Sequence, residues 1–223
     1  MQRRTGIRPL LWLFVPYIVL SLVHVVALAA RSPWGPPTKL TLMPLLALPV
    51  IVLAARVRPR VTLALLLAAI VLSWLGDGAG TFFRTDNELP LMLLFFGLAH
   101  IAYIVLFWRY LRRTRLPWWS LVYVLWWVGM LALLWPHAGA LLPAIAAYGL
   151  VLGGTAALAA RCHPIIAFGG AFFLLSDTVL ALRLFLPVEL PHWTSPLVML
   201  TYTLGQGLIV FGALHVLRRG EKA

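Results

Sequence analysis

Two aspartates have the residue type and the setting to carry chemistry. Asp77 and Asp177 each lie within a long apolar stretch, residues 61–80 and 164–186. A carboxylate is expensive to place in hydrocarbon, so an acid in such a stretch indicates a functional site by default. Two carboxyl groups in different surroundings can divide the acid and base roles of a reaction, and paired intramembrane acids also serve as proton relays. The alternative for a single buried aspartate is a hydrogen bond that only joins neighbouring helices.

The rise of an α-helix puts the two aspartates at a similar depth. Asp77 lies about 16 residues, or roughly 24 Å, along its helix, and Asp177 about 13 residues, or roughly 20 Å, along its own. Other polar side chains of the apolar stretches reach the same layer, namely His100, Tyr103, Tyr202 and Gln206. His100 fits a core histidine as well as a site residue, and the tyrosines fit ordinary packing. We interpret Ser21 and His24 as packing residues.

The elements that must position these side chains are transmembrane helices. The chain has 223 residues, of which 62% are hydrophobic and 11% charged, with a mean hydropathy of +0.96. These values exclude an ordinary soluble domain, and a membrane-spanning helix needs about 20 mostly apolar residues. Such stretches cover residues 9–30, 39–56, 61–80, 89–108, 118–135, 139–160, 164–186 and 195–217. We therefore predict an all-α, polytopic membrane bundle of eight transmembrane helices, forming one integral membrane domain over residues 1–223.

The basic residues predict the orientation of this bundle. Fourteen of the eighteen lysines and arginines fall before the first stretch, after the last, or in alternate loops, and the outside set is Arg31, Lys39, Arg84 and Arg183. Cytoplasmic loops carry such an excess, so both termini are predicted to be cytoplasmic, as in a multi-pass protein of the bacterial inner membrane. The net charge of +12 is spread over short clusters, which argues against a nucleic-acid partner. The other four acids, Asp86, Glu88, Glu189 and Glu221, are expected to be solvated.

Three further features concern the N-terminus, an internal repeat and the single cysteine. Residues 1–30 resemble a signal peptide, but the apolar run is long for one and contains Pro16 and His24, so we expect an uncleaved first helix. Residues 71–77 and 172–177 both end in aspartate and precede a helix with a polar centre, which predicts a weak four-plus-four parallel repeat. The single Cys162 allows no intrachain disulfide and no cysteine metal cluster.

These stretches resemble the YhhN family, whose animal members include lysoplasmalogenases. The similarity rests on Gly76-Asp77, on residues 96–103, on residues 169–177 and on residues 201–209. It extends to Lys39 with Pro44, and to Pro143 with Tyr148, so that it runs from about residue 39 to 209. Gly78 and Gly80 depart from the family pattern, in which apolar residues follow the aspartate.

The resemblance implies cleavage of the vinyl ether bond of a lysoplasmalogen, a lysophospholipid substrate held among membrane lipids. The products are a fatty aldehyde and a glycerophospho-ethanolamine or -choline. This hydrolysis begins with protonation of the β-carbon, so it needs a proton donor and a base. We assign these roles to Asp77 and Asp177 together, without choosing between them. Orienting or substrate-binding roles are expected for Lys39 at the phosphate, and for His100, Tyr103, Ser176, Tyr202 and Gln206.

Two other functions fit the same residues. A proton-coupled transporter of lipids or small molecules would use paired intramembrane acids and an internal repeat. A membrane metallohydrolase would bind a metal through His100, His24 and the two aspartates, although zinc sites usually contain several histidines. We expect no metal and no cofactor.

Overall fold

The computed structural model describes residues 7–83 and 88–219, and every regular element in them is helical. Six charged residues lie outside the described residues, three of them among the basic residues predicted to be cytoplasmic: Arg3, Arg4, Arg84, Asp86, Glu221 and Lys222. The long helices are α1 (Ile7–Ala29), α2 (Gly35–Val52), α3 (Arg60–Asp77), α5 (Glu88–Leu106), α6 (Val122–Ala138), α7 (Leu142–Ala159), α8 (Pro164–Phe185) and α9 (Thr194–Arg219). Shorter elements are α4 (Ala79–Phe83), a π-helical turn after α5 (Phe107–Leu111), and 3₁₀ turns at Trp118–Leu121 and Gly139–Leu141.

Seven helical segments of the described chain are long and apolar enough to cross a membrane. The chain is therefore an integral, multi-pass membrane protein, and the predicted all-α class is confirmed. One of the seven, Trp118–Ala159, has 42 residues and contains both α6 and α7. These two helices fold back on each other at Gly139, whose φ of +51° lies in the region that favours glycine. Eight separate crossings and the four-plus-four repeat stay predictions.

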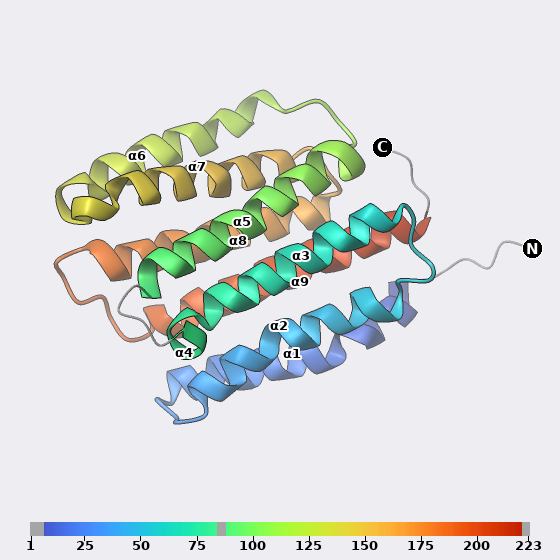
Figure 1. Cartoon of the computed structure of the whole chain (residues 1–223), viewed down its shortest axis with the longest axis horizontal. Helices are drawn as coiled ribbons and strands as arrows, with labels where there is room; N and C mark the ends of the chain where they lie inside the picture. The colour runs from blue at the N-terminus through green and yellow to red at the C-terminus, as the bar shows by residue number, and fades with distance from the viewer. Residues whose placement is uncertain (1–6, 84–87, 220–223) are drawn as a thin grey trace, which may run out of the picture.

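The long helices lie side by side along the length of the bundle (Figure 1). The α1–α2 pair forms one edge and the α6–α7 pair the other, while α3 and α5 lie over α9 and α8. The start of α1 and the end of α9 are at the same end of the bundle. Two basic loops also meet at one place, because the backbone N–H groups of Arg113 and Thr114 donate to the carbonyl of Arg161 at 2.8 and 3.1 Å.

Close packing of backbones joins α8 to α9. A Cβ atom added at Gly169 would lie 2.8 Å from the backbone nitrogen of Ile209, and one added at Gly205 would lie 2.8 Å from that of Phe173. Glycine at both positions therefore lets the two helices approach more closely than any other residue would allow. This contact fixes α8, which carries Asp177, against α9, which carries Tyr202.

Helix boundaries differ from the predicted spans in one place that affects the site. The span predicted as 61–80 ends at Asp77, because Gly78 follows at the C-cap and a separate short helix, α4, begins at Ala79. Gly78 and Gly80 weaken helix continuation, since glycine is about 1 kcal/mol less favourable than alanine within a helix. Asp77 is thus the last residue of α3 and lies beside a break in the chain.

Candidate active site

One cavity of about 140 Å³ contains both aspartates. Its lining comes from α2, α3, α5, α7, α8 and α9, and its polar members are Lys39, Asp77, Tyr148, Ser176, Asp177 and Tyr202. The rest of the lining is almost wholly apolar, with leucine, methionine, phenylalanine and valine side chains. The cavity therefore joins two acids to a space that suits a hydrocarbon chain.

Asp77 is held by one cation and one hydroxyl. Its Oδ1 lies 3.4 Å from Nζ of Lys39, and its Oδ2 accepts a hydrogen bond of 2.7 Å from the Tyr202 hydroxyl. The Asp77 side chain is 4% exposed, whereas that of Lys39 is 35% exposed. An adjacent ammonium group stabilises the ionised form of a carboxyl group, and a hydroxyl that donates to it does so as well. These two partners favour the carboxylate form of Asp77, whereas its burial opposes that form.

The position of Lys39 follows from the packing of α2 on α3. Pro36 and Pro37 begin α2, where a missing N–H costs no hydrogen bond. One turn later, the backbone carbonyl of Leu40 accepts a 2.9 Å hydrogen bond from Nε1 of Trp74 on α3. This bond ties the first turns of α2 to the last turn of α3, and so places Lys39 beside Asp77.

Asp177 has different surroundings. Its Oδ2 accepts a short hydrogen bond from the Tyr148 hydroxyl on α7, and no lysine, arginine or histidine of residues 7–83 and 88–219 forms a salt bridge with it. The neighbouring Ser176 donates to the backbone carbonyl of Val198 at 3.0 Å, which links α8 to α9. Ser176 is buried, and its hydroxyl proton is used in that hydrogen bond. Asp177 is therefore a carboxyl group with a hydroxyl partner and no counter-cation.

A second polar layer lies behind Tyr202. The Tyr103 hydroxyl donates to Oε1 of Gln206 at 2.5 Å, and Nε2 of Gln206 donates to the Ser73 hydroxyl at 2.9 Å. Gln206 also interacts with the Tyr202 hydroxyl. Neither Tyr103 nor Gln206 lines the cavity, so the roles expected for them at a carboxyl group or substrate stay predictions. They instead support Tyr202, which binds Asp77.

His100 is enclosed by aromatic rings. Its side chain is buried, with its ring centroid 4.6 Å from that of Phe173 and 5.7 Å from that of Tyr148. Neither ring nitrogen has a hydrogen-bond partner within the described chain, and His100 does not line the cavity. The predicted role of His100 in orienting a carboxyl group therefore has no direct contact to support it.

The hypothesis of a bound metal also has no observed contact to support it. In the described ranges, no three histidine, cysteine or acidic side chains lie close enough together to hold a metal ion.

Tyr148 is a site residue that sequence reasoning did not single out. It entered only through the family resemblance, together with Pro143, and no spacing links it to Asp177, 29 positions away. The contact arises because α7 packs against α8, which brings the middle of one helix to the middle of the other. A sequence pattern within one helix carries no signal for such a pair.

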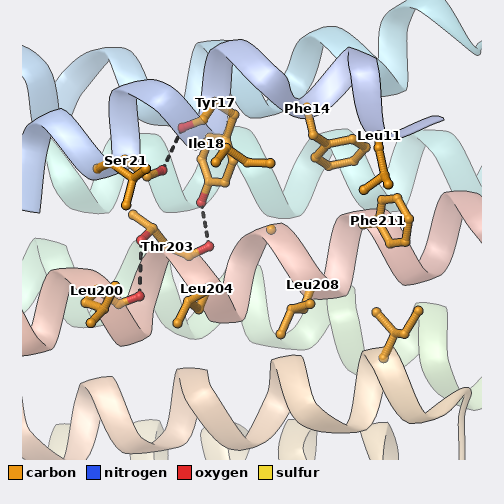
Figure 2. Close-up of a pocket in the computed structure, with 13 residues that line it drawn as sticks. Leu11, Phe14, Tyr17, Ile18, Ser21, Leu200, Thr203, Leu204, Leu208 and Phe211 are labelled. Atoms are coloured by element: carbon orange, nitrogen blue, oxygen red, sulfur yellow. Dashed lines mark hydrogen bonds between the residues drawn. The ribbon is translucent and has the colours of Figure 1, made fainter. Parts of the chain in front are cut away.

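A contrasting cavity of about 270 Å³ lies between α1 and α9 (Figure 2). Its lining includes Leu11, Phe14, Ile18, Leu204 and Phe211, and no charged residue. The few polar groups there are satisfied by backbone atoms, as with the Tyr17 hydroxyl on the carbonyl of Thr203 at 2.8 Å and the Ser21 hydroxyl on the carbonyl of Tyr17 at 2.7 Å. Among the described residues that line this groove there is no carboxyl group, histidine or lysine.

Comparison with known proteins gives one match. The model of the YhhN family matches residues 34–213, which include all the segments on which the predicted resemblance rests. No curated protein matches the chain, and no solved structure does.

Proposed function

We propose that this chain, which belongs to the YhhN family, is an intramembrane hydrolase that cleaves the vinyl ether bond of a lysoplasmalogen. The observation that carries the proposal is the pair of carboxyl groups in one largely apolar cavity, only one of them beside a cation. Hydrolysis of a vinyl ether needs a proton donor and a base at the same time. Two carboxyl groups in unlike surroundings can serve as both.

We assign the two roles from the charge environment of each aspartate. Asp177, which has no counter-cation, holds the proton and delivers it to the β-carbon of the vinyl ether. The carbon–carbon double bond supplies the electron pair, and the product is an oxocarbenium ion beside the ionised Asp177. Asp77, held as a carboxylate by Lys39, accepts a proton from water as the water oxygen bonds to the α-carbon. The result is a hemiacetal.

Collapse of the hemiacetal restores both aspartates. Asp77 gives its new proton to the ether oxygen, and the bond between that oxygen and the α-carbon breaks. The hemiacetal hydroxyl returns its proton to Asp177 as the aldehyde carbonyl forms. A fatty aldehyde and a glycerophosphate-containing alcohol leave, and each carboxyl group is again in its starting protonation state.

The proposal includes a placement in the membrane. Eight crossings, with α6 and α7 counted separately, put both termini on one side, consistent with the start of α1 and the end of α9 lying together (Figure 1). The excess of basic residues at that end makes it the cytoplasmic side of a cell membrane, such as the bacterial inner membrane. The aspartates then lie in the half of the bundle farther from the cytoplasm.

The test is an assay of the purified protein in detergent. Lysoplasmalogen and the matching ester lysophospholipid are supplied separately, and released aldehyde and fatty acid are quantified. We expect aldehyde from the first substrate, no fatty acid from the second, and loss of aldehyde release in both Asp77→Asn and Asp177→Asn. Near-full aldehyde release by two folded variants would refute the paired-aspartate site. Proton-coupled uptake by proteoliposomes without any product would instead favour a transporter.

A further inference from the structure

A second and larger cavity adjoins the aspartate cavity. It has a volume of about 370 Å³, and we call it the vestibule. Lys39, Asp77, Leu180, Val198 and Met199 line both spaces, so the vestibule meets the aspartate cavity at the Lys39–Asp77 ion pair. Its other polar side chains come from four further places on the chain and are His24, Thr81, Arg183 and Ser195.

The vestibule has an excess of positive charge. Lys39 and Arg183 line it, and Asp77 is its only acidic residue among those the structure describes. Asp77 pairs with Lys39, and no carboxyl group of the described chain forms a salt bridge with Arg183. Under the proposed orientation these are two of only four basic residues on the outer side. A basic residue on that side opposes the usual bias, which calls for a specific reason.

The guanidinium group of Arg183 is held by one hydrogen bond that uses only one of its N–H donors. One guanidinium nitrogen, Nη1, donates to the Thr194 hydroxyl, and that hydroxyl donates in turn to the carbonyl of Pro191 at 2.7 Å. This contact uses one of the five N–H groups that a guanidinium carries. The planar group thus has a fixed position, and several of its N–H donors stay available for an anion. A guanidinium group can donate two parallel hydrogen bonds to two oxygens of one phosphate. Arginine is therefore the usual residue for phosphate recognition.

His24 adds a buried polar group to the same wall. Its side chain is 1% exposed, and its Nδ1 lies 2.8 Å from Oγ1 of Thr38. Nε2 of His24 has no hydrogen-bond partner within the described residues. A buried polar nitrogen without a partner destabilises the folded protein, and a ligand in the vestibule that hydrogen-bonds to it offsets that cost.

We infer that the vestibule is a phosphate subsite, in which Arg183, together with Lys39, binds the phosphodiester of a lysophospholipid head group. The inference rests on the proposed function, because it identifies the substrate end that lies next to the aspartates. A lysoplasmalogen has a phosphate, a short glycerol unit, a vinyl ether and a hydrocarbon chain in that order. The protein has the matching groups in the same order: the cations of the vestibule, then Asp77 where the two cavities meet, then the apolar aspartate cavity.

Two substrates that differ only in the phosphate test this subsite. They are a lysoplasmenylethanolamine and the 1-alkenylglycerol with the same chain, both hydrolysed by the purified protein in detergent. In Arg183→Gln we expect KM for the phospholipid to rise about tenfold or more, because the hydrogen bonds between two charged groups are lost. KM for the alkenylglycerol should change less than about twofold on the same argument. Equal effects on both substrates would overturn the subsite and leave the hydrolase intact.

Matched variants separate binding from folding. Arg31→Gln removes another basic residue of the outer set, one that does not line the vestibule, and should change neither KM. Thr194→Val removes the tether of Arg183 but keeps its charge, so it should lower the unfolding temperature while preserving most of the preference for the phosphate. If Thr194→Val loses that preference as fully as Arg183→Gln, then Arg183 acts only through the tether, and the subsite is refuted.

A binding measurement keeps the subsite testable if no aldehyde forms. The unfolding temperature of the wild type is measured with 1-acyl lysophosphatidylethanolamine and with the monoacylglycerol of the same chain. We expect the phospholipid to raise it more, and Arg183→Gln to remove the difference. If the phospholipid stabilises the protein in this way but no aldehyde is released in the assay, the hydrolase proposal is refuted and the phosphate subsite is supported. Equal shifts in the wild type would sink the subsite.

Discussion

Asp77 and Asp177 line one cavity but have different neighbours. Asp77 ends α3 beside the break at Gly78, where Lys39 and Tyr202 reach its two oxygens. Asp177 lies well inside α8, where the Tyr148 hydroxyl is its partner and no cation of the described chain pairs with it. The first carboxyl group also borders the polar vestibule, while the second does not line it.

Two residues of the same type in one cavity can therefore have unequal roles. A helix end leaves Asp77 next to a second helix start, from which a lysine side chain can reach it. A position within a helix surrounds Asp177 with side chains of α7 and α9, which are apolar or hydroxyl-bearing here. Opposite charge favours the ionised carboxyl group, and its absence favours the neutral one. In the proposed mechanism, this difference in surroundings separates base from acid without any difference in residue type.

The largest effect is expected for Asp177→Asn. An amide cannot deliver the proton that begins vinyl ether hydrolysis, so kcat should fall about a thousandfold, within the usual range for a general acid. The folded state should be as stable as the wild type, since no ion pair is broken. Aldehyde release and thermal unfolding of the same sample give both readouts. If Asp177→Asn retains a tenth of the activity while Asp77→Asn is inactive, the two roles are reversed.

Asp77→Asn should have the next largest effect. Removal of the base should lower kcat about a hundredfold. The variant also leaves Lys39 without its counter-charge, and because that lysine is one-third exposed the loss of stability should be about 1 kcal/mol or less. The double variant Asp77→Asn/Lys39→Met should recover the stability but not the activity. Recovery of activity in the double variant would contradict a base at residue 77.

The two tyrosines test the same comparison at smaller scale. Tyr202→Phe removes the hydroxyl that donates to Asp77, and Tyr148→Phe removes the one that donates to Asp177. Each should lower kcat about tenfold, as expected for one hydrogen bond to a charged or reacting group. Adding Tyr202→Phe to Asp77→Asn should lower kcat little further. Adding it to Asp177→Asn should lower kcat by the full factor of about ten. Full additivity in both pairs would show that Tyr202 does not act through Asp77.

The sequence predicted the helical membrane class and the two aspartates because both follow from local signals. Apolar stretches of helix length and isolated acids within them can be recognised without any tertiary contact. The partners of those acids could not be predicted in the same way. Tyr148 and Arg183 are functional candidates only because α7 packs on α8, and because the last turns of α8 and the first turns of α2 line the same vestibule.

The roles expected for His100, Tyr103 and Gln206 show the limit of an argument from depth. The sequence places all three at one predicted depth, yet none of them lines the cavity. Depth along a helix gives one coordinate, and the direction in which a side chain points depends on helix rotation, which packing sets. Gln206 turns toward Tyr103 and Ser73, and His100 toward Phe173. His24, interpreted as packing, instead lines the vestibule.

The smallest effect is expected where the site depends on the α8–α9 contact. In Gly205→Ala the new methyl group would lie 2.8 Å from the backbone nitrogen of Phe173 and 3.0 Å from the carbonyl oxygen of Gly169. Backbone atoms cannot turn aside as side chains can, so α8 and α9 must separate slightly, at a cost of about 1–3 kcal/mol. Asp177 moves with α8 and Tyr202 with α9, and we expect kcat to fall only a few-fold.

Gly129→Ala on α6 is the matched control for this last variant. A methyl group there meets nothing within 4 Å, and alanine favours the helix over glycine by about 1 kcal/mol. Its unfolding temperature should therefore stay level or rise, with unchanged aldehyde release. If Gly205→Ala behaves in the same way, then close approach of α8 and α9 does not set the distance between the two aspartates, and the unequal surroundings of Asp77 and Asp177 must be maintained by α2 and α7 alone.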